Sequence, residues 1–409
     1  MIALAPPAHP ARAEEPAGSA TLRLQEALGR ALAHNKELAA FEHRFTEQEG
    51  RREQAGLLPN PEVHLEIENA AGSGRFEGFD SAETTLSLGW VLEGRIRAGR
   101  VDVAEAGAEV ISAEARILRV EVAADTAEHF LASLASQARL AQAEEAIALA
   151  ERTVEAVARR VRAGRTPPAE LARAEAELAR ERLARDDVTH ERDAAYHRLA
   201  AQWGETEPGF SRVEGDLLDL PPVEPYAALS QRLERNPEFA RYATEERLAK
   251  ANRRLAEARR WPVLRPRLGV RRLEATDDTA LVADVSLPIP LLDRRQGEIA
   301  ASRARVSRAR AEAEAARVRL HTTLFELYEE LEHHFHRADT LRAEVLPRLA
   351  EALDGTRRAY ERGRYGYLEL RSVQTELLRA QNDLLEASAG VHQLVIALER
   401  LIGERVVQK

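Results

Sequence analysis

The sequence predicts a mainly α-helical chain with a small β part, made of two copies of one structural unit. The composition is the first observation: only 5% of the 409 residues are aromatic and 31% are charged, which is typical of long helices. The second is a pair of stretches of about 65 residues that are almost free of proline and glycine. The third is a pair of short segments in each half whose residues alternate between apolar and polar.

A near-constant offset relates the two halves of the chain. The segment Arg159–Arg165 ends in Ala-Gly-Arg, and Tyr360–Arg364 ends in Arg-Gly-Arg, so that Gly164 and Gly363 lie 199 residues apart. The same offset relates Ser87-Leu88 to Ser286-Leu287, and a similar one relates Asn35 to Asn236. Fixed-period similarity of this kind indicates duplication. We therefore expect repeat 1 at 20–215 and repeat 2 at 216–409.

In repeat 1 the pattern predicts helices over 22–33 and 36–57, ended by Pro59 and Pro61. A two-residue period then predicts a hairpin at about 62–92, with a glycine-rich turn between its strands. A helix over 97–162 would be about 100 Å long at 1.5 Å per residue. It should reverse into a second long helix at a tip near residue 164.

Repeat 2 predicts the same order, with a hairpin at about 264–289 and a tip near residue 363. Its long helix, 296–362, is interrupted only by Pro347, which should kink it. The last helix has apolar residues at steps of three and four, the period of helices that supercoil around one another. These residues are Leu370, Val373, Leu377, Ala380, Leu384, Ala387, Val391, Leu394, Leu398 and Leu401.

Several protein classes are excluded by composition. The chain has no cysteine, hence no disulfide and no thiolate site. A net charge of −9 argues against nucleic acid as a partner. No window is apolar enough for a membrane-spanning helix. Residues 1–19 are expected to be a signal-peptide remnant or a disordered tail, because Ala11-Arg12-Ala13 fits a signal-peptidase site.

The strands constrain the assembly. They have one apolar and one polar face, as a sheet between lipid and water requires. Four strands cannot close a membrane barrel, and an open edge in lipid leaves backbone groups unpaired. Copies of the chain must therefore share their strands. Two copies supply eight strands and three supply twelve, and strand counting alone does not choose between them.

The two-repeat plan, the hairpins and both turn segments resemble the TolC family of outer-membrane efflux proteins, from about Thr21 to Glu404. Ala55–Glu62, Glu66–Asn69 and Phe79–Glu83 resemble its heavy-metal (CzcC-like) branch. The resemblance implies a homotrimer with an α-helical barrel in the periplasm and a shared 12-stranded β-barrel in outer-membrane lipid. It also implies an exit duct for heavy-metal cations, with a periplasmic adaptor (membrane fusion protein) and an inner-membrane resistance-nodulation-division (RND) pump as partners.

The family's functional positions are carried over to the two tips. Tyr360 matches a tyrosine that donates a hydrogen bond to the acidic residue matched by Glu170, and Glu369 matches an acidic residue of the pore constriction. The second acidic ring position is Ser372 and the tip arginine position is Tyr365, so the sequence departs from the family here, and Arg364 is expected to substitute. Arg362 or Arg364 is expected to add a charge-assisted bond to a neighbouring carboxylate at the closed tips. The expected adaptor-docking residues at the tips are Arg162, Gly164, Arg165 and Gly363.

No motif in the sequence predicts an enzyme or a cofactor. There is no glycine-rich phosphate loop, nucleophile elbow or HExxH motif. His333 and His336 are three residues apart on a helix and are weak candidates for metal ligands. We expect instead a solvated helix face, because no second cluster completes a four-ligand set.

Two alternative functions remain open at this point. One is a duct of the same fold that serves drug efflux or type I secretion. The other is a soluble coiled-coil scaffold, which the alternating strands disfavour.

Overall fold

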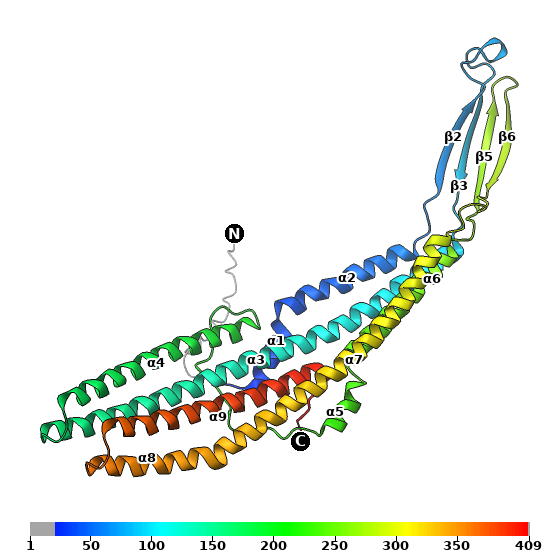
Figure 1. Ribbon diagram of the computed structural model, residues 1–409. Helices are drawn as coiled ribbons and strands as arrows, with labels where there is room; N and C mark the ends of the chain where they lie inside the picture. Colours follow the sequence, from blue (N-terminus) through cyan, green and yellow to red (C-terminus); the bar gives the residue numbers. More distant parts are fainter. Residues whose placement is uncertain (1–20, 408–409) are drawn as a thin grey trace, which may run out of the picture. The chain divides into compact units, whose positions relative to one another are not determined.

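The computed structural model describes residues 21–407; the expected signal-peptide remnant or tail at 1–19 lies outside them. Figure 1 shows long helices lying beside one another and a separate group of four strands. The first half contains β1 (Thr21–Leu22), α1 (Leu24–His34), α2 (Lys36–Gly56), β2 (Glu62–Glu68), a 3-10 turn at Gly74–Phe76, β3 (Glu83–Gly89), α3 (Gly94–Arg162) and α4 (Pro168–Ala201). The second contains β4 (Arg212–Val213), α5 (Tyr226–Leu233), α6 (Pro237–Ala258), β5 (Arg265–Leu273), β6 (Asp278–Ser286), α7 (Gln296–Thr340), a π-helical turn at Leu341–Val345, α8 (Leu346–Glu361) and α9 (Tyr367–Ile402).

Two compact units share these elements. Of the described residues, the helical unit comprises 21–39, Ile117–Asn236 and 319–407. The sheet unit comprises Ala40–Arg116 and Pro237–Val318. Each unit takes segments from both halves of the sequence, so a unit is not a repeat. The division at residue 215 remains a prediction from the duplication.

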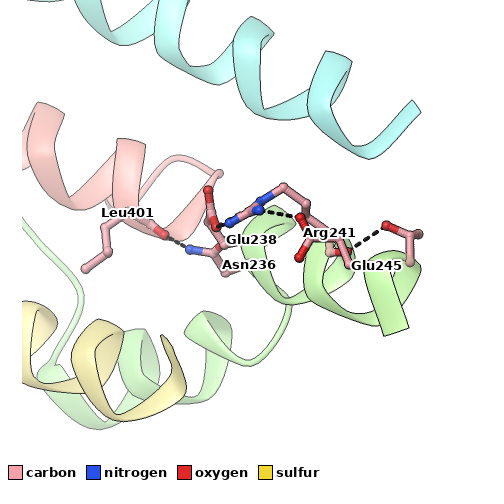
Figure 2. A network of polar contacts seen from close by, with 6 residues as sticks. Asn236, Glu238, Arg241, Glu245 and Leu401 are labelled. Carbon is pink, nitrogen blue, oxygen red and sulfur yellow. Dashed lines mark hydrogen bonds and ion pairs between the residues drawn. The ribbon is translucent and has the colours of Figure 1, made fainter. Parts of the chain in front are cut away.

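Two asparagines make equivalent contacts in the two halves of the helical unit. Asn35 donates its side-chain amide to the carbonyl of Gln202 (3.0 Å), at the end of α4. Asn236 donates to the carbonyl of Leu401, at the end of α9 (Figure 2). Gln202 and Leu401 are 199 residues apart, the offset of the tip glycines. In the sheet unit, Figure 2 also shows Arg241 between Glu238 and Glu245, at 2.8 and 2.6 Å.

The main core of the helical unit lies where α1, α3 and α4 meet the short parallel pair β1–β4. Trp203 and Phe210 follow α4 and fold back onto it; the Tyr196 and Phe210 ring centroids are 5.2 Å apart. The buried residues of this core are Leu22, Ala27, Phe130, Leu134, Tyr196, Leu199, Ala200, Trp203, Phe210, Val213 and Leu217.

The four-stranded sheet has the order β2-β3-β5-β6, and all its pairs are antiparallel. The register places residues of one kind opposite one another, because paired residues share a face. One face is apolar and exposed, and contains Val63, Leu65, Leu86, Leu88, Leu268, Val270, Leu281 and Val285. The other is polar and contains His64, Glu66, Glu68, Thr85, Ser87, Arg267, Arg271 and Asp284. The predicted grouping of strand residues into two faces is confirmed.

The long helices also follow the predictions. α3 is continuous over 69 residues. The predicted interruption near Pro347 is present as a π-helical turn over Leu341–Val345. Proline has no N–H to donate to the carbonyl four residues earlier, and the wider turn accommodates that missing bond. Within residues 21–407, no helix is both long and apolar enough to cross a membrane.

Candidate functional site

The two helical tips have the same backbone structure. The N–H of Gly164 donates to the carbonyl of Val161 and that of Arg165 to Arg160, each at 2.9 Å. In the second tip Gly363 donates to Tyr360 and Arg364 to Ala359, also at 2.9 Å. Both glycines have positive φ, 67° and 78°. This is the Schellman arrangement, which satisfies the last carbonyls of a helix and reverses the chain.

Arg160 links the two tips. Its Nε donates to Thr166 Oγ1 (3.1 Å), and its Nη1 donates to the backbone carbonyl of Tyr360. The guanidinium carbon also lies 4.7 Å from the centre of the Tyr360 ring. One side chain of α3 thus holds the end of α8 by a charge-assisted hydrogen bond and a cation–π contact. Its equivalent in the second repeat is Ala359, so this link has no counterpart there.

Tyr360 is almost completely buried, with 1% of its surface exposed. Its ring packs in an apolar cluster with Val157, Ala174, Tyr367 and Leu370. The hydroxyl has no hydrogen-bond partner among residues 21–407, so the predicted bond from Tyr360 to Glu170 is not formed in this structure. Burial, and then the negative charge of Glu170, raise the pKa of the Tyr360 hydroxyl. Packing, rather than that hydrogen bond, fixes this side chain.

The other predicted gate residues make local contacts. Within residues 21–407, Arg362 donates its Nε to the carbonyl of Arg358 (3.1 Å) and does not pair with a carboxylate. Glu369 accepts the N–H of Gly366 (3.1 Å) and so caps the start of α9. Arg364, the proposed substitute for the tip arginine, is exposed. Tyr360 thus contacts Arg160, which the sequence did not single out as a gate residue.

The predicted docking residues lie at the two turns and are all exposed: Arg162, Gly164, Arg165 and Gly363. They are available to a partner in the single chain.

A polar layer inside the helical unit was not predicted. Glu177 on α4 forms an ion pair with Arg371 on α9, and Gln374 donates to Thr153 Oγ1 of α3 (2.8 Å). Glu181 lies one turn beyond Glu177, and these five residues line one small cavity with Tyr367. Burial, and then the negative charge of Glu177, raise the pKa of Glu181. The layer connects three helices and contains one more carboxyl group than arginine.

The three histidines of the cluster lie on α7. His333 and His336 are not brought together with other ligands, and His334 is held against Gly390, where an added Cβ would lie 2.4 Å from its Nδ1. Among the described residues, no three His, Cys, Asp or Glu side chains converge in a way that could hold a metal ion.

The chain is similar to known proteins over nearly its whole length. A family model described as "Outer membrane efflux protein" matches residues 27–205 and 228–404. The cobalt-zinc-cadmium resistance protein CzcC of Cupriavidus metallidurans is 28% identical over 93% of this chain and 90% of its own length. The nickel-cobalt-cadmium resistance protein NccC of Alcaligenes xylosoxydans xylosoxydans is 28% identical over 72% of this chain and 67% of its own.

Solved structures share the fold. A CusC structure superposes with a TM-score of 0.79 at 16% identity, covering 93% of this chain and 92% of that one. The outer membrane protein VceC of Vibrio cholerae gives 0.73 at 17% identity, covering 94% and 96%. These likenesses and the two matched segments confirm the predicted fold class and family resemblance. The chain belongs to the outer membrane efflux protein family.

Proposed function

We propose that this chain is the outer-membrane exit duct of a tripartite efflux system that exports heavy-metal cations. It works as a homotrimer with a periplasmic adaptor and an inner-membrane RND pump. The metal assignment rests on the similarity to CzcC across 93% of the chain. The duct has no cofactor and catalyses no reaction; its partners drive transport.

The sheet unit supports a position in the outer membrane. Its strands carry large exposed apolar side chains on one face only, with Leu65 61% and Leu281 90% exposed. Burying a surface of this kind in water-free surroundings is favourable by about 25 cal/mol per Å². The opposite face contains ion pairs suited to an aqueous lumen, such as Arg267 with Asp284 (2.9 Å).

A tolerance assay tests the metal assignment. Deleting the gene in a host that keeps the adaptor and pump should lower tolerance to Co²⁺, Zn²⁺ and Cd²⁺, and the intact gene should restore it. Tolerance to hydrophobic drugs should not change. Drug sensitivity without metal sensitivity would favour the duct for drug efflux, and loss of a secreted protein would favour type I secretion.

The exposed tips are the proposed adaptor-docking surface. Replacing Arg162 and Arg165 together by glutamate should abolish metal tolerance by preventing docking. Because neither side chain is buried, the variant should keep the bilayer conductance of the parent. A variant that retains full metal tolerance would remove these arginines from the docking surface.

The proposed gate consists of Glu170, Tyr360, Arg362, Arg364 and Glu369, and we add Arg160 because it contacts Tyr360. Three copies of Glu369 around the pore axis would attract cations, as acidic rings do in other pores. Glu369→Gln tests this role, since an amide oxygen can still accept the N–H of Gly366 while the charge is lost. Cation selectivity in planar bilayers should fall without loss of stability. Unchanged cation selectivity would mean that Glu369 caps α9 and does not contribute to ion selection.

A further inference from the structure

Three segments of the sheet unit meet at the end of the sheet where α3 and α7 begin and α6 ends (Figure 1). We call these segments, 90–97, 259–266 and 287–298, the junction collar. The N–H groups of Trp90 and Leu92 donate to the carbonyls of Pro266 and Leu264, each at 3.0 Å. Arg259 forms an ion pair with Glu298 (3.2 Å), which joins the end of α6 to the start of α7.

The junction collar is strongly basic in a chain whose net charge is −9. It contains seven arginines against three carboxylates. At the opposite end of the sheet, residues 69–82 and 274–278 contain one arginine against five carboxylates. The two ends of one sheet therefore carry opposite charge. Such an asymmetry predicts which end attracts anions.

All three carboxylates of the junction collar are engaged within the chain. Glu93 pairs with Arg100 (2.5 Å), and Glu298 pairs with both Arg259 and Arg295. Asp293 accepts the backbone N–H of Arg295 (2.8 Å). Asp293 keeps its negative charge, and the seven arginines of the collar exceed its three carboxylates by four.

Several exposed guanidinium groups of the collar thus lack a carboxylate partner within residues 21–407, among them those of Arg95, Arg260 and Arg294. Arg95 lies over the indole of Trp261, 5.0 Å from its centroid, and that indole is 60% exposed. A cation stacked on an exposed aromatic ring at the border of an apolar surface is typical of a membrane interface.

Apolar surface adjoins the arginines. Leu88 and Val285 lie on the apolar face at this end of the sheet. Leu291 and Leu292, shortly before Arg294, are 69% and 91% exposed. A phospholipid has the matching order of groups, with acyl chains for the apolar face and a phosphate for the guanidiniums.

We propose that the junction collar binds phospholipids with anionic head groups through Arg95, Arg260 and Arg294, with Trp261 at the level of the head groups. This inference rests on the proposed position of the sheet in a membrane. Beyond that proposed function, the inference says at which end of the sheet anionic lipid binds and which side chains select it.

Lipid retention by the full-length protein tests the proposal. The detergent-solubilised protein is titrated with phosphatidylglycerol or phosphatidylcholine, and bound lipid is counted by native mass spectrometry at several salt concentrations. We expect phosphatidylglycerol to be retained at least tenfold more tightly, equivalent to about 1.4 kcal/mol. Added salt should weaken only the phosphatidylglycerol, because screening acts on charge.

A matched pair of variants locates the site. Arg95→Gln, Arg260→Gln and Arg294→Gln together should abolish the preference for phosphatidylglycerol. The control Arg152→Gln, Arg173→Gln and Arg379→Gln removes the same charge from exposed positions of the helical unit and should keep it. Lysine at the three collar positions should restore most of it. If the glutamine triple variant does not fold, two measurements still test the proposal: the salt dependence of phosphatidylglycerol binding by the parent, and the lipid preference of the lysine variant.

Two outcomes would overturn the proposal. One is equal retention of both lipids by the parent. The other is a glutamine variant that still prefers phosphatidylglycerol over phosphatidylcholine. This includes the case in which a neighbouring copy of the chain covers the collar, so that the variant weakens subunit association and leaves the lipid preference unchanged. Bilayer conductance is measured in parallel. A parent that conducts but shows no lipid preference leaves the duct function intact, whereas one that neither inserts nor conducts contradicts the duct itself.

Discussion

Arg160 is the residue whose contacts most directly connect the two tips. It reaches the backbone carbonyl and the ring of Tyr360 and, through Thr166, the turn of its own tip. A hydrogen bond to a charged group contributes about 1.5–3 kcal/mol, enough to favour one tip position and little enough for a binding partner to outweigh it.

Arg160→Ala should therefore raise the single-channel conductance of the duct. Arg159→Ala is the matched control, because within residues 21–407 the Arg159 side chain forms an ion pair only with Glu155, at 3.8 Å, and both are well exposed. Tyr360→Phe should leave conductance near that of the parent, since the hydroxyl it removes has no partner among the described residues. If Tyr360→Phe raises the conductance and Arg160→Ala does not, the Tyr360 hydroxyl, and not Arg160, holds the tips closed.

Glu181 should make the stability of the helical unit depend on pH. Burial and the charge of Glu177 raise its pKa in the folded chain above that of a free glutamate, about 4.3. Between the two values the folded state binds more protons than the unfolded state, so stability falls as pH rises through this window. The polar layer is then most stable when Glu181 is protonated.

Glu181→Gln should accordingly raise the melting temperature of the detergent-solubilised protein at pH 7, followed by circular dichroism. We expect about 1–3 °C, because 1 kcal/mol corresponds to roughly 2–4 °C in a domain of this size and solvent screens a partly exposed carboxyl. The difference should vanish below about pH 4, where the parent is also protonated. Glu175→Gln, an exposed position on α4, is the control and should change little.

Sequence could predict the individual tip residues but not their partners. Gly164, Gly363 and Tyr360 stand out because the repeat places them at equivalent helix ends. Arg160 does not, because its importance depends on contact with a residue 200 positions away. Its only signal was a difference between the repeats, arginine in one and alanine in the other.

At the scale of elements, the sequence predicted helices and strands closely. The prolines after α2 and the change from helical period to strict alternation placed β2 at Glu62–Glu68, inside the predicted hairpin. The polar layer was not predicted, because its residues have no distinctive pattern in the sequence. Glu177, Arg371 and Gln374 read as ordinary surface residues of amphipathic helices until packing brings α3, α4 and α9 together.

The two faces of the sheet give a test within a single strand. Leu65 belongs to the apolar face of β2 and His64 to the polar face, and both are exposed. Arginine on a lipid-facing position near mid-membrane costs about 2–4 kcal/mol, and far less on a water-facing one. Leu65→Arg should reduce the assembled outer-membrane protein, measured in membrane fractions, while His64→Arg assembles normally. Equal assembly of the two would contradict the assignment of Leu65 to a lipid-facing position, and poorer assembly of His64→Arg would mean that the two faces are reversed.

At the scale of the whole molecule, the sheet is incomplete as a single chain. β2 and β6 are its outer strands, and each has one side without a partner strand in the described residues. Unpaired backbone groups cost several kcal/mol each in lipid, so neighbouring copies must pair with them. The strand count permits two or three copies, and the family resemblance selects three.

We predict a trimer in which β2 of one copy pairs with β6 of the next. The chain has no cysteine, so two introduced cysteines report on this seam without background. Within one chain β2 and β6 are separated by two strands, roughly 14 Å, far beyond the reach of a disulfide. Cysteine at Glu66 combined with cysteine at successive positions from Asp278 to Ser286 should therefore cross-link only between copies.

In at least one register, a non-reducing gel should show dimers and trimers but nothing larger, because a ring of three copies is closed. Native mass spectrometry of the parent in detergent should give three times the mass of the chain as its main species. A main species of two copies, or cross-links that extend beyond three, would reject the trimer. Absence of cross-links in every register, with a trimer still present by mass, would place the contact between copies on the helices instead of the sheet edges.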